Sequence, residues 1–184
     1  MSQPILMVDI DNTLADYTDA LRDYIHETMD PDDYPCPDPV EYDMTLTDGW
    51  PFTGRPADYR WWHKRAVADG LYSKEQPYPH AVDTLKRLHD DGWWILIATS
   101  RRDDMRGDTI RWLNNNRIPH DGLYMGDKTL IQASVTLEDN PTTIRRLTDL
   151  GRYVIHPDHK YCRDEKYDSY HDWNQLPNLL EEEL

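Results

Sequence analysis

The feature that most constrains this chain is a short apolar run near its start that ends in two carboxylates. The run Ile5–Val8 has four bulky side chains with no polar residue between them, which predicts a buried strand. Asp9 and Asp11 follow, one residue apart. Side chains two apart along an extended chain point the same way, so both carboxylates are expected on one side where the strand ends. Two acids held together repel unless a cation or proton lies between them, and Mg²⁺, which prefers carboxylate oxygens, suits that place.

Two other interpretations of the Asp-x-Asp pair need comparison. A calcium loop that began at Asp9 would need glycine at its sixth position and glutamate at its twelfth. Those positions hold Leu14 and Ala20, which excludes a calcium loop of this kind. A strand end with two solvated acids explains the pair equally well when it is considered alone, so the rest of the chain has to decide.

Length and charge limit the classes of protein to consider. The 184 residues are enough for one domain, or for a core with a small insert. The formal charge is −15, from 35 acidic and 20 basic residues, which disfavours a polynucleotide partner but leaves room for a small phosphate substrate. Cys36 and Cys162 match no metal or redox spacing, so free thiols are expected. The start lacks a secretion signal and no apolar run is long enough to cross a bilayer, so we expect a cytoplasmic protein without a membrane partner.

Strands alternate with helices along most of the chain, which predicts an α/β fold with a Rossmann-like parallel sheet flanked by helices. Helices are expected over 17–28, 57–69, 80–91, 103–116, 142–150 and from about 173. Strands are expected over 5–8, 93–98, 135–137 and 153–155, with a short strand or turn over 122–126. The segment 30–56 is rich in Pro, Asp and Tyr and is expected to be irregular or loosely structured. The predicted division is a core domain of residues 1–15 and 79–184, with a small helical cap domain, 16–78, inserted after the first strand.

The aromatic residues of the predicted cap have two interpretations. Trp61 and Trp62 either form the core of a small helical insert or belong to a lid whose rings stack on a planar ligand such as a nucleobase. Four histidines form no known ligand spacing with cysteine and are expected at the surface: His63, His80, His156 and His159.

Polar side chains follow successive predicted strands at the point where each strand ends. They are Asp9 and Asp11, Thr99 and Ser100, Lys128, and the pair Glu138 and Asp139. Ligands bind at the carboxyl ends of the strands in open α/β sheets. Each of these residues is ordinary by itself, since a hydroxyl after a strand usually caps a helix and a lysine usually faces solvent. Their combination at consecutive strand ends predicts a single site.

These four groups of residues resemble the four motifs of the haloacid dehalogenase-like superfamily of phosphohydrolases. Within that superfamily, residues 127–139, 14–17 and 170–173, together with the position of the insert, resemble the 5′(3′)-deoxyribonucleotidases. Two residues depart from the family pattern. Glu138 stands where a second Asp is usual, and we expect it to orient a water or Lys128 rather than to bind the metal. Asn12 stands where many members have Gly.

The resemblance implies a catalytic mechanism and its residues. Asp9 would be the nucleophile that forms an aspartyl-phosphate, and Asp11 would protonate the leaving oxygen and later deprotonate water. The metal ligands for Mg²⁺ would be Asp9, Asp139 and the backbone carbonyl of Asp11. Lys128 would offset the negative charge, and Thr99 would donate a hydrogen bond to a phosphoryl oxygen.

The expected substrate is a small phosphate monoester, with a 5′-(deoxy)nucleoside monophosphate favoured. The candidate substrate-binding residues are Asp16, Tyr17, Trp62, Ser100 and Arg101. A first alternative is a 3′-phosphatase on nucleic-acid ends, because residues 99–113 are also similar to the phosphatase domains of phage-type polynucleotide kinases. A second alternative is a nucleotide-binding module without turnover. The sequence leaves open the base, the sugar and whether the chain forms a homodimer.

Overall fold

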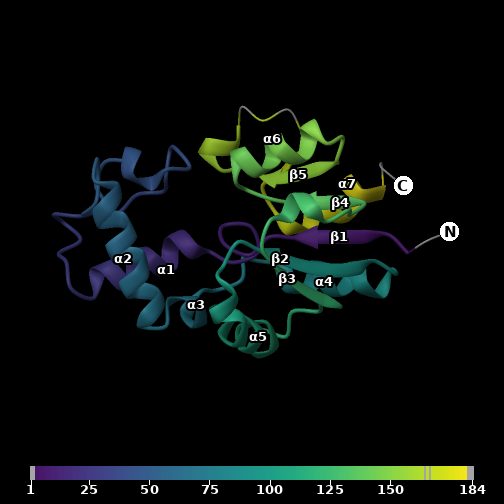
Figure 1. Ribbon diagram of the computed structural model, residues 1–184, viewed down its shortest axis with the longest axis horizontal. Helices are drawn as coiled ribbons and strands as arrows, with labels where there is room; N and C mark the ends of the chain where they lie inside the picture. The colour runs from purple at the N-terminus through teal and green to yellow at the C-terminus, as the bar shows by residue number, and fades with distance from the viewer. Residues whose placement is uncertain (1–2, 164, 166, 182–184) are drawn as a thin grey trace.

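A six-stranded parallel sheet forms the centre of the computed structural model, which describes residues 3–163, 165 and 167–181 (Figure 1). The strand order is β3-β2-β1-β4-β5-β6. The strands are β1 (Ile5–Val8), β2 (Trp94–Thr99), β3 (Gly122–Met125), β4 (Val135–Leu137), β5 (Val154–Pro157) and β6 (Ser169–Tyr170). The α/β fold predicted from the sequence is therefore confirmed.

The central position of β1 follows from its composition, because a strand with neighbours on both sides and covered faces needs apolar side chains throughout. Leu6, Met7 and Val8 are fully buried. Val8 aligns with Ile97 of β2 on one side and with Leu137 of β4 on the other. This register brings the residues that follow β1 and β4 next to each other at the carboxyl edge of the sheet.

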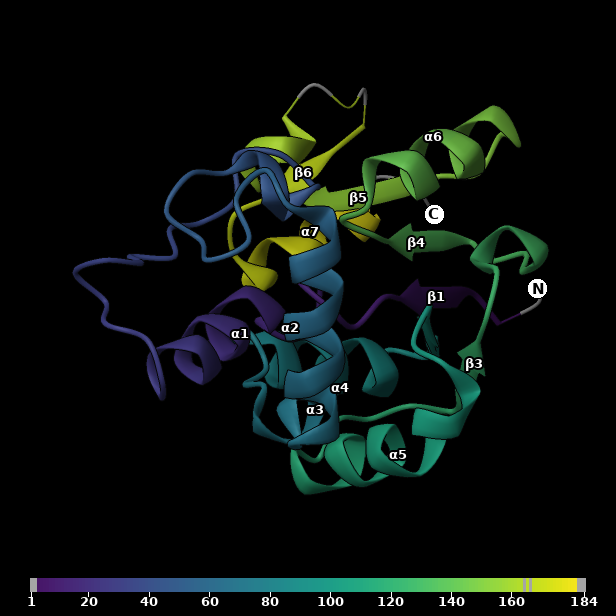
Figure 2. The same cartoon turned by 60° about the vertical axis from the view of Figure 1, so that its left-hand side comes forward.

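Helices cover both faces of the sheet (Figures 1 and 2). The helices of the core are α4 (Ala81–Asp90), α5 (Arg106–Asn115), α6 (Pro141–Asp149) and α7 (Leu176–Glu181). Side chains of α4, α5 and α7 pack in one large apolar cluster with Leu6, Val8 and Ile95. On the other face, α6 packs against β5 through Ile144, Leu147 and Val154.

The insert after β1 lies beside the sheet and contains α1 (Tyr17–His26), α2 (Pro56–Ala68) and α3 (Leu71–Lys74) (Figure 1). It has an apolar cluster of its own, centred on residues such as Leu21, Ile25 and Phe52. Its entry and exit run side by side: the Asp16 N–H donates to Gln76 O at 3.0 Å, and the Tyr78 N–H donates to Leu14 O at 2.9 Å. We call residues 16–78 the cap; its status as a separate domain with these limits stays a prediction.

The segment 30–56 is better packed than its composition indicates. It holds only the short 3₁₀ helix Met44–Leu46, as the lack of periodicity implies, yet Cys36, Trp50 and Phe52 are almost fully buried. The Trp50 indole N–H donates to Pro37 O at 2.9 Å. The expectation of loose structure was wrong, because buried rings and side-chain hydrogen bonds fix irregular backbone without any repeating pattern.

The surface assignment was also wrong for one histidine. His156 lies on β5 and is 2% exposed, so it belongs to the interior. His63 and His159 are half-buried, and His80 is exposed. In the described part of the chain, no helix combines the length and the apolar character that crossing a bilayer requires.

Candidate active site

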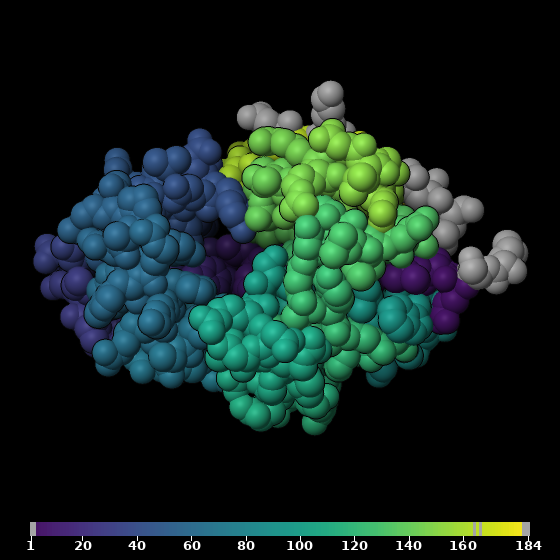
Figure 3. Space-filling view, viewed as in Figure 1, coloured from purple at the N-terminus to yellow at the C-terminus, as the bar shows by residue number. Residues whose placement is uncertain are grey.

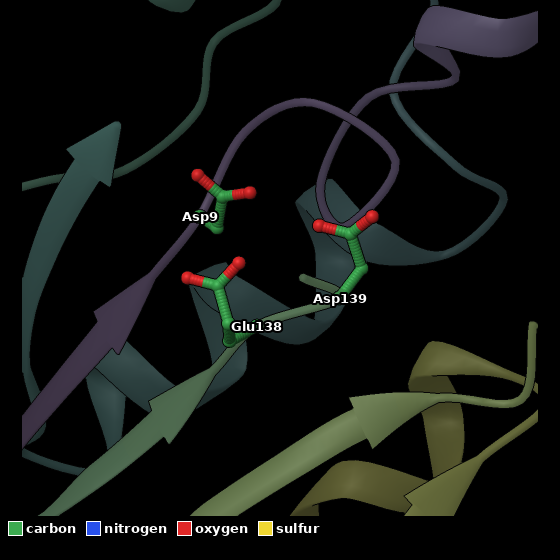
Figure 4. Close-up of side chains that lie close together, drawn as sticks. All are labelled: Asp9, Glu138 and Asp139. Atoms are coloured by element: carbon green, nitrogen blue, oxygen red, sulfur yellow. The ribbon is translucent and has the colours of Figure 1, made fainter. Parts of the chain in front are cut away.

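Three buried carboxylates meet at the carboxyl edge of the sheet. Asp9 follows β1, and Glu138 and Asp139 follow β4. Their side chains point into a common space (Figure 4), and each offers an oxygen within 4.8 Å of the others. The register of β1 and β4 explains this meeting, since Val8 and Leu137 are aligned and the Asp9 N–H donates to Leu137 O at 3.0 Å.

Lys128 supplies the positive charge of this cluster. Its Nζ lies 2.6 Å from Asp9 Oδ1 and 2.5 Å from Glu138 Oε2, and its side chain is only 4% exposed. Glu138 thus contacts Lys128, one of the two partners expected for it, and the expectation that it does not bind the metal stays a prediction. One ammonium facing three carboxylates leaves the cluster with excess negative charge when all three are ionised.

The electrostatics of the cluster reflect that excess. Burial, followed by the charges of Glu138 and Asp11, raises the pKa of Asp9 to about 7 even though Lys128 opposes the shift. Burial, followed by the charges of Asp9 and Glu138, also raises the pKa of Asp139. Burial alone would lower the pKa of Lys128, but Asp9 and Glu138 outweigh it and hold that pKa above its usual value. A set of hard oxygen donors with surplus negative charge fits a divalent cation such as Mg²⁺.

Asp139 is held in place by neighbours on two sides. Thr13 Oγ1 donates to its Oδ1 at 3.3 Å, and the Tyr161 hydroxyl donates to its Oδ2 at 2.8 Å. The next residue, Asn140, caps α6 by accepting the Thr142 N–H at 2.9 Å, and Pro141 fills the first position of the helix. The Glu-Asp-Asn-Pro sequence thus ends a strand and starts a helix with the carboxylates fixed between them.

Asp11 has other side-chain partners than Asp9. The backbone turns sharply after β1, because Ile10 O accepts the N–H groups of both Leu14 and Ala15 at 2.9 Å. The Asp11 carboxylate then receives the guanidinium of Arg101, with Nε at 3.2 and 3.1 Å from its two oxygens. The simple alternation argument therefore does not describe this pair, since only Asp9 joins the three-carboxylate cluster. The expected ligand of Asp11 is its backbone carbonyl, and that role stays a prediction.

The residues after β2 lie at the same edge. Thr99 is fully buried, and its Oγ1 accepts the Arg101 N–H at 3.2 Å. Ser100 is exposed at the surface of the cavity described next. The site thus collects Asp9, Thr99, Lys128 and Asp139 at one edge of the sheet, as the sequence predicted.

A cavity of about 430 Å³ lies between the core and the cap. Figure 3 shows the corresponding hollow, with the cap in blue on one side and the core in green on the other. Of the predicted substrate-binding residues, Tyr17, Ser100 and Arg101 line it. The full lining is Asp11, Asn12, Tyr17, Pro39, Tyr42, Asp43, Met44, Tyr59, His63, Tyr72, Ser100, Arg101, Asp139 and Tyr161.

Aromatic rings dominate the cap side of this cavity. The Tyr17 hydroxyl lies 2.8 Å from His63 Nδ1 and 3.3 Å from the Tyr59 hydroxyl. Burial lowers the pKa of His63, which favours a neutral ring near pH 7. Tyr59 and His63 are four residues apart on α2 and share a face, a helical spacing that would have identified them from the sequence. Tyr42 lies in irregular backbone, where no such spacing exists.

Two predicted substrate-binding residues lie elsewhere. Trp62 packs edge-on against Tyr24, with ring centroids 6.3 Å apart, and is not among the residues that line the cavity. Asp16 caps α1 by accepting the Asp19 N–H at 2.9 Å and lines a different surface hollow. In these positions Trp62 contributes to packing within the cap, and Asp16 stabilises the start of α1.

The fold defines a class of proteins that includes several solved structures. A haloacid dehalogenase-like hydrolase from Streptococcus pneumoniae superposes with a TM-score of 0.68 at 13% identity, covering 98% of this chain and 100% of that one. An L-2-haloacid dehalogenase from Xanthobacter autotrophicus superposes with a TM-score of 0.63 at 14% identity, covering 98% and 99% of the two chains. At such identities the similarity establishes the haloacid dehalogenase-like fold.

The family follows from the sequence itself. Residues 3–181 match the family described as "5′ nucleotidase, deoxy (Pyrimidine), cytosolic type C protein", and this chain belongs to that family. A Chlorobaculum tepidum protein named "Putative 5′(3′)-deoxyribonucleotidase" is 27% identical over 159 residues, which cover 82% of this chain and 77% of that protein. The chain is therefore a phosphoric monoester hydrolase of the nucleotidase type.

Proposed function

We propose that this protein is a Mg²⁺-dependent 5′-nucleotidase that removes phosphate from (deoxy)nucleoside monophosphates through an aspartyl-phosphate. The observation that carries the proposal is the buried group of Asp9, Lys128, Glu138 and Asp139 beside an aromatic cavity of about 430 Å³. The proposal places the enzyme in the cytoplasm, in keeping with two buried cysteines that are free thiols.

The chain's own residues account for both halves of the reaction. In the first, an Asp9 carboxylate oxygen attacks phosphorus, the bond from phosphorus to the sugar oxygen breaks, and Asp11 gives its proton to that oxygen. In the second, Asp11 takes a proton from water, the water oxygen attacks phosphorus, and phosphate leaves while Asp9 is regenerated. Lys128 reduces repulsion between Asp9 and the phosphoryl oxygens, and Thr99 donates a hydrogen bond to one of them.

The metal belongs with the same residues. Asp9, Asp139 and the backbone carbonyl of Asp11 would hold Mg²⁺, with Glu138 adjacent, and the ion would neutralise charge on the transferring phosphoryl group. The excess of carboxylates over ammonium groups supports this part of the proposal.

The substrate assignment rests on size and on aromatic character. A cavity of about 430 Å³ falls in the range of small-molecule sites. Its tyrosine rings suit a flat nucleobase, and the name of the Chlorobaculum tepidum relative agrees. A net charge of −15 disfavours long polyphosphates, so a 3′-phosphatase acting on nucleic-acid ends enters only as an arm of the test.

The test is a phosphatase panel with and without Mg²⁺, with Asp9→Asn as the blank. The panel holds 5′- and 3′-deoxynucleotides, ribonucleotides and 3′-phosphorylated oligonucleotides. We expect Mg²⁺-dependent release of phosphate from 5′-nucleotides that the blank lacks. Preference for oligonucleotide ends would favour the polynucleotide alternative, and tight nucleotide binding without hydrolysis would indicate a module that has lost turnover.

A further inference from the structure

A buried carboxylate at the exit of the cap reaches the active site through one arginine. Glu75 follows α3, and its side chain is fully buried. It forms an ion pair with Arg101, whose side chain is also fully buried. Arg101 Nη2, which holds Glu75, also lies 2.5 Å from Asp11 Oδ1. Glu75, Arg101 and Asp11 therefore form a continuous chain of charge-assisted hydrogen bonds.

Arg101 is fixed at both ends. Its backbone N–H donates to Thr99 Oγ1 at 3.2 Å, and its guanidinium carbon lies 3.7 Å from the ring centre of Tyr72. Glu75 is anchored as well, because its carbonyl accepts the Trp112 indole N–H at 2.8 Å. A guanidinium held by a rigid carboxylate and an aromatic face presents its remaining donors to Asp11 in one orientation.

The arrangement is poor as a purely structural ion pair. Burying a carboxylate is costly unless all of its hydrogen-bonding capacity is used. Glu75 Oε1 and Arg101 Nη1 are both buried and, among the described residues, have no hydrogen-bond partner. Two ionisable groups have been taken from water with part of their hydrogen-bonding capacity unused, whereas an apolar pair would fill the same space at lower cost.

We propose that Glu75 is a positioning residue for phosphoryl transfer: it fixes Arg101, which in turn orients the Asp11 carboxyl group toward the leaving oxygen. The inference rests on the proposed function, in which Asp11 protonates that oxygen. It also connects the cap to the chemistry, since Glu75 and Tyr72 both belong to the cap and Asp11 belongs to the core.

The experiment compares two substrates with different needs for an acid. A deoxynucleoside 5′-monophosphate releases an alkoxide, which must be protonated, whereas p-nitrophenyl phosphate releases a stable phenolate. We expect Glu75→Gln to lower kcat/KM for the nucleotide by about 10- to 100-fold, a part of what general acid catalysis contributes. The value for p-nitrophenyl phosphate should stay within about 3-fold, because binding and nucleophile are untouched. Glu27→Gln, which removes an exposed partner of Lys74, is the matched control and should change neither value.

Two further variants make the outcomes decisive. In an Asp11→Asn background, Glu75→Gln should cause no additional loss on the nucleotide, because Glu75 acts through Asp11. Glu75→Asp keeps the charge but shortens the side chain, and it should reproduce the leaving-group pattern if Glu75→Gln does not fold. Equal losses on both substrates, or no loss on either, would overturn the positioning role. If Asp11→Asn itself shows no leaving-group dependence, the assigned role of Asp11 fails, and with it this inference; if wild type releases no more phosphate than Asp9→Asn, the proposed function fails.

Discussion

The two walls of the cavity are built in different ways. We call the core wall the charged groups at strand ends that line the cavity, such as Asp11, Arg101 and Asp139, together with the buried cluster that adjoins Asp139. In that cluster Lys128 Nζ lies within 2.6 Å of Asp9 and Glu138. The cap wall consists mainly of rings, and the polar contacts among them are between neutral groups such as Tyr17 and His63. The core wall can stabilise charge during a reaction, while the cap wall can select the shape of what is held there.

The difference lies in what fixes each wall. The core wall is set by the register of parallel strands, so a shift of one residue would move the carboxylates apart. The cap wall is set by a helix face and by irregular backbone around Tyr42. Substitutions in the core wall should therefore affect kcat, and those in the cap wall should affect KM.

The largest effect is expected from Asp9→Asn. Replacing the proposed nucleophile should reduce turnover of a 5′-nucleotide by on the order of 10⁴-fold or more. Phosphate release under saturating substrate and Mg²⁺ measures it. Asp43→Asn, on the cap wall, is the contrasting variant and should leave kcat within about 3-fold of wild type. Comparable turnover in wild type and Asp9→Asn would mean that the core wall does not carry the reaction.

The second-largest effect is expected from Lys128→Met. Loss of the ammonium leaves Asp9 and Glu138 buried without their cation, so kcat should fall by about 10²-fold or more. The free energy of unfolding of the metal-free protein should fall by about 3–5 kcal/mol, the usual cost of breaking a buried pair. Steady-state kinetics and urea unfolding measure the two effects. Lys86→Met, on the exposed face of α4, should change unfolding by less than about 0.5 kcal/mol.

Tyr42→Ala tests the cap wall. The Tyr42 hydroxyl accepts a hydrogen bond from Asn140 Nδ2 at 3.0 Å, and its ring packs edge-on against Tyr161. Loss of one stacking ring should raise KM for nucleotides by about 10-fold, with a smaller change in kcat. Trp62→Ala removes a larger ring from the same cap, but one that packs against Tyr24, and should leave KM within about 2-fold. The reverse order of effects would mean that the substrate lies against a different face of α2.

The smallest effect concerns pH and Mg²⁺. Because the pKa of Asp9 is raised from 3.8 to about 7, the folded metal-free protein binds a proton that the unfolded chain has already lost. The contribution of Asp9 to stability should therefore fall as pH rises from about 4 to 7. In the proposed metal site Mg²⁺ would replace that proton, so the rise in Tm on adding Mg²⁺ should be about 2–4 °C larger at pH 8 than at pH 6. Differential scanning calorimetry measures it, and Asp9→Asn should remove the part of the pH dependence that Asp9 contributes, while the raised pKa of Asp139 leaves another part in place.

The sequence predicted the core wall well because that wall obeys short-range rules. An apolar run followed by Asp9, another followed by Thr99, and a third followed by Glu138 and Asp139 identify three strand ends, and parallel topology brings them together. The sharp turn after Ile10 directs the Asp11 side chain toward Arg101, and the alternation of side chains along a strand could not predict it. It depends on the positive φ of Asn12 (58°) and on backbone hydrogen bonds inside the loop.

The cap was harder to predict than the core wall, for a physical reason. Tyr59 and His63 follow a helical period, so the sequence could have identified them as neighbours. The positions of Tyr42 and Glu75 depend on tertiary contacts with residues far along the chain. Trp62 was predicted to bind substrate because its ring is large, but the size of a side chain does not show which way it points. Its neighbour on the helix, His63, is turned toward the cavity instead.

The paired entry and exit of the cap have a consequence for how such enzymes diversify. Leu14 and Tyr78 are joined by one backbone hydrogen bond, so 63 intervening residues begin and end at nearly the same place. A tight turn could close that gap, and an insert of another length could replace the present one, while the strand register of the scaffold stayed intact. In such an architecture the insert that determines substrate selectivity can be replaced, while the scaffold that carries the reaction chemistry stays constant.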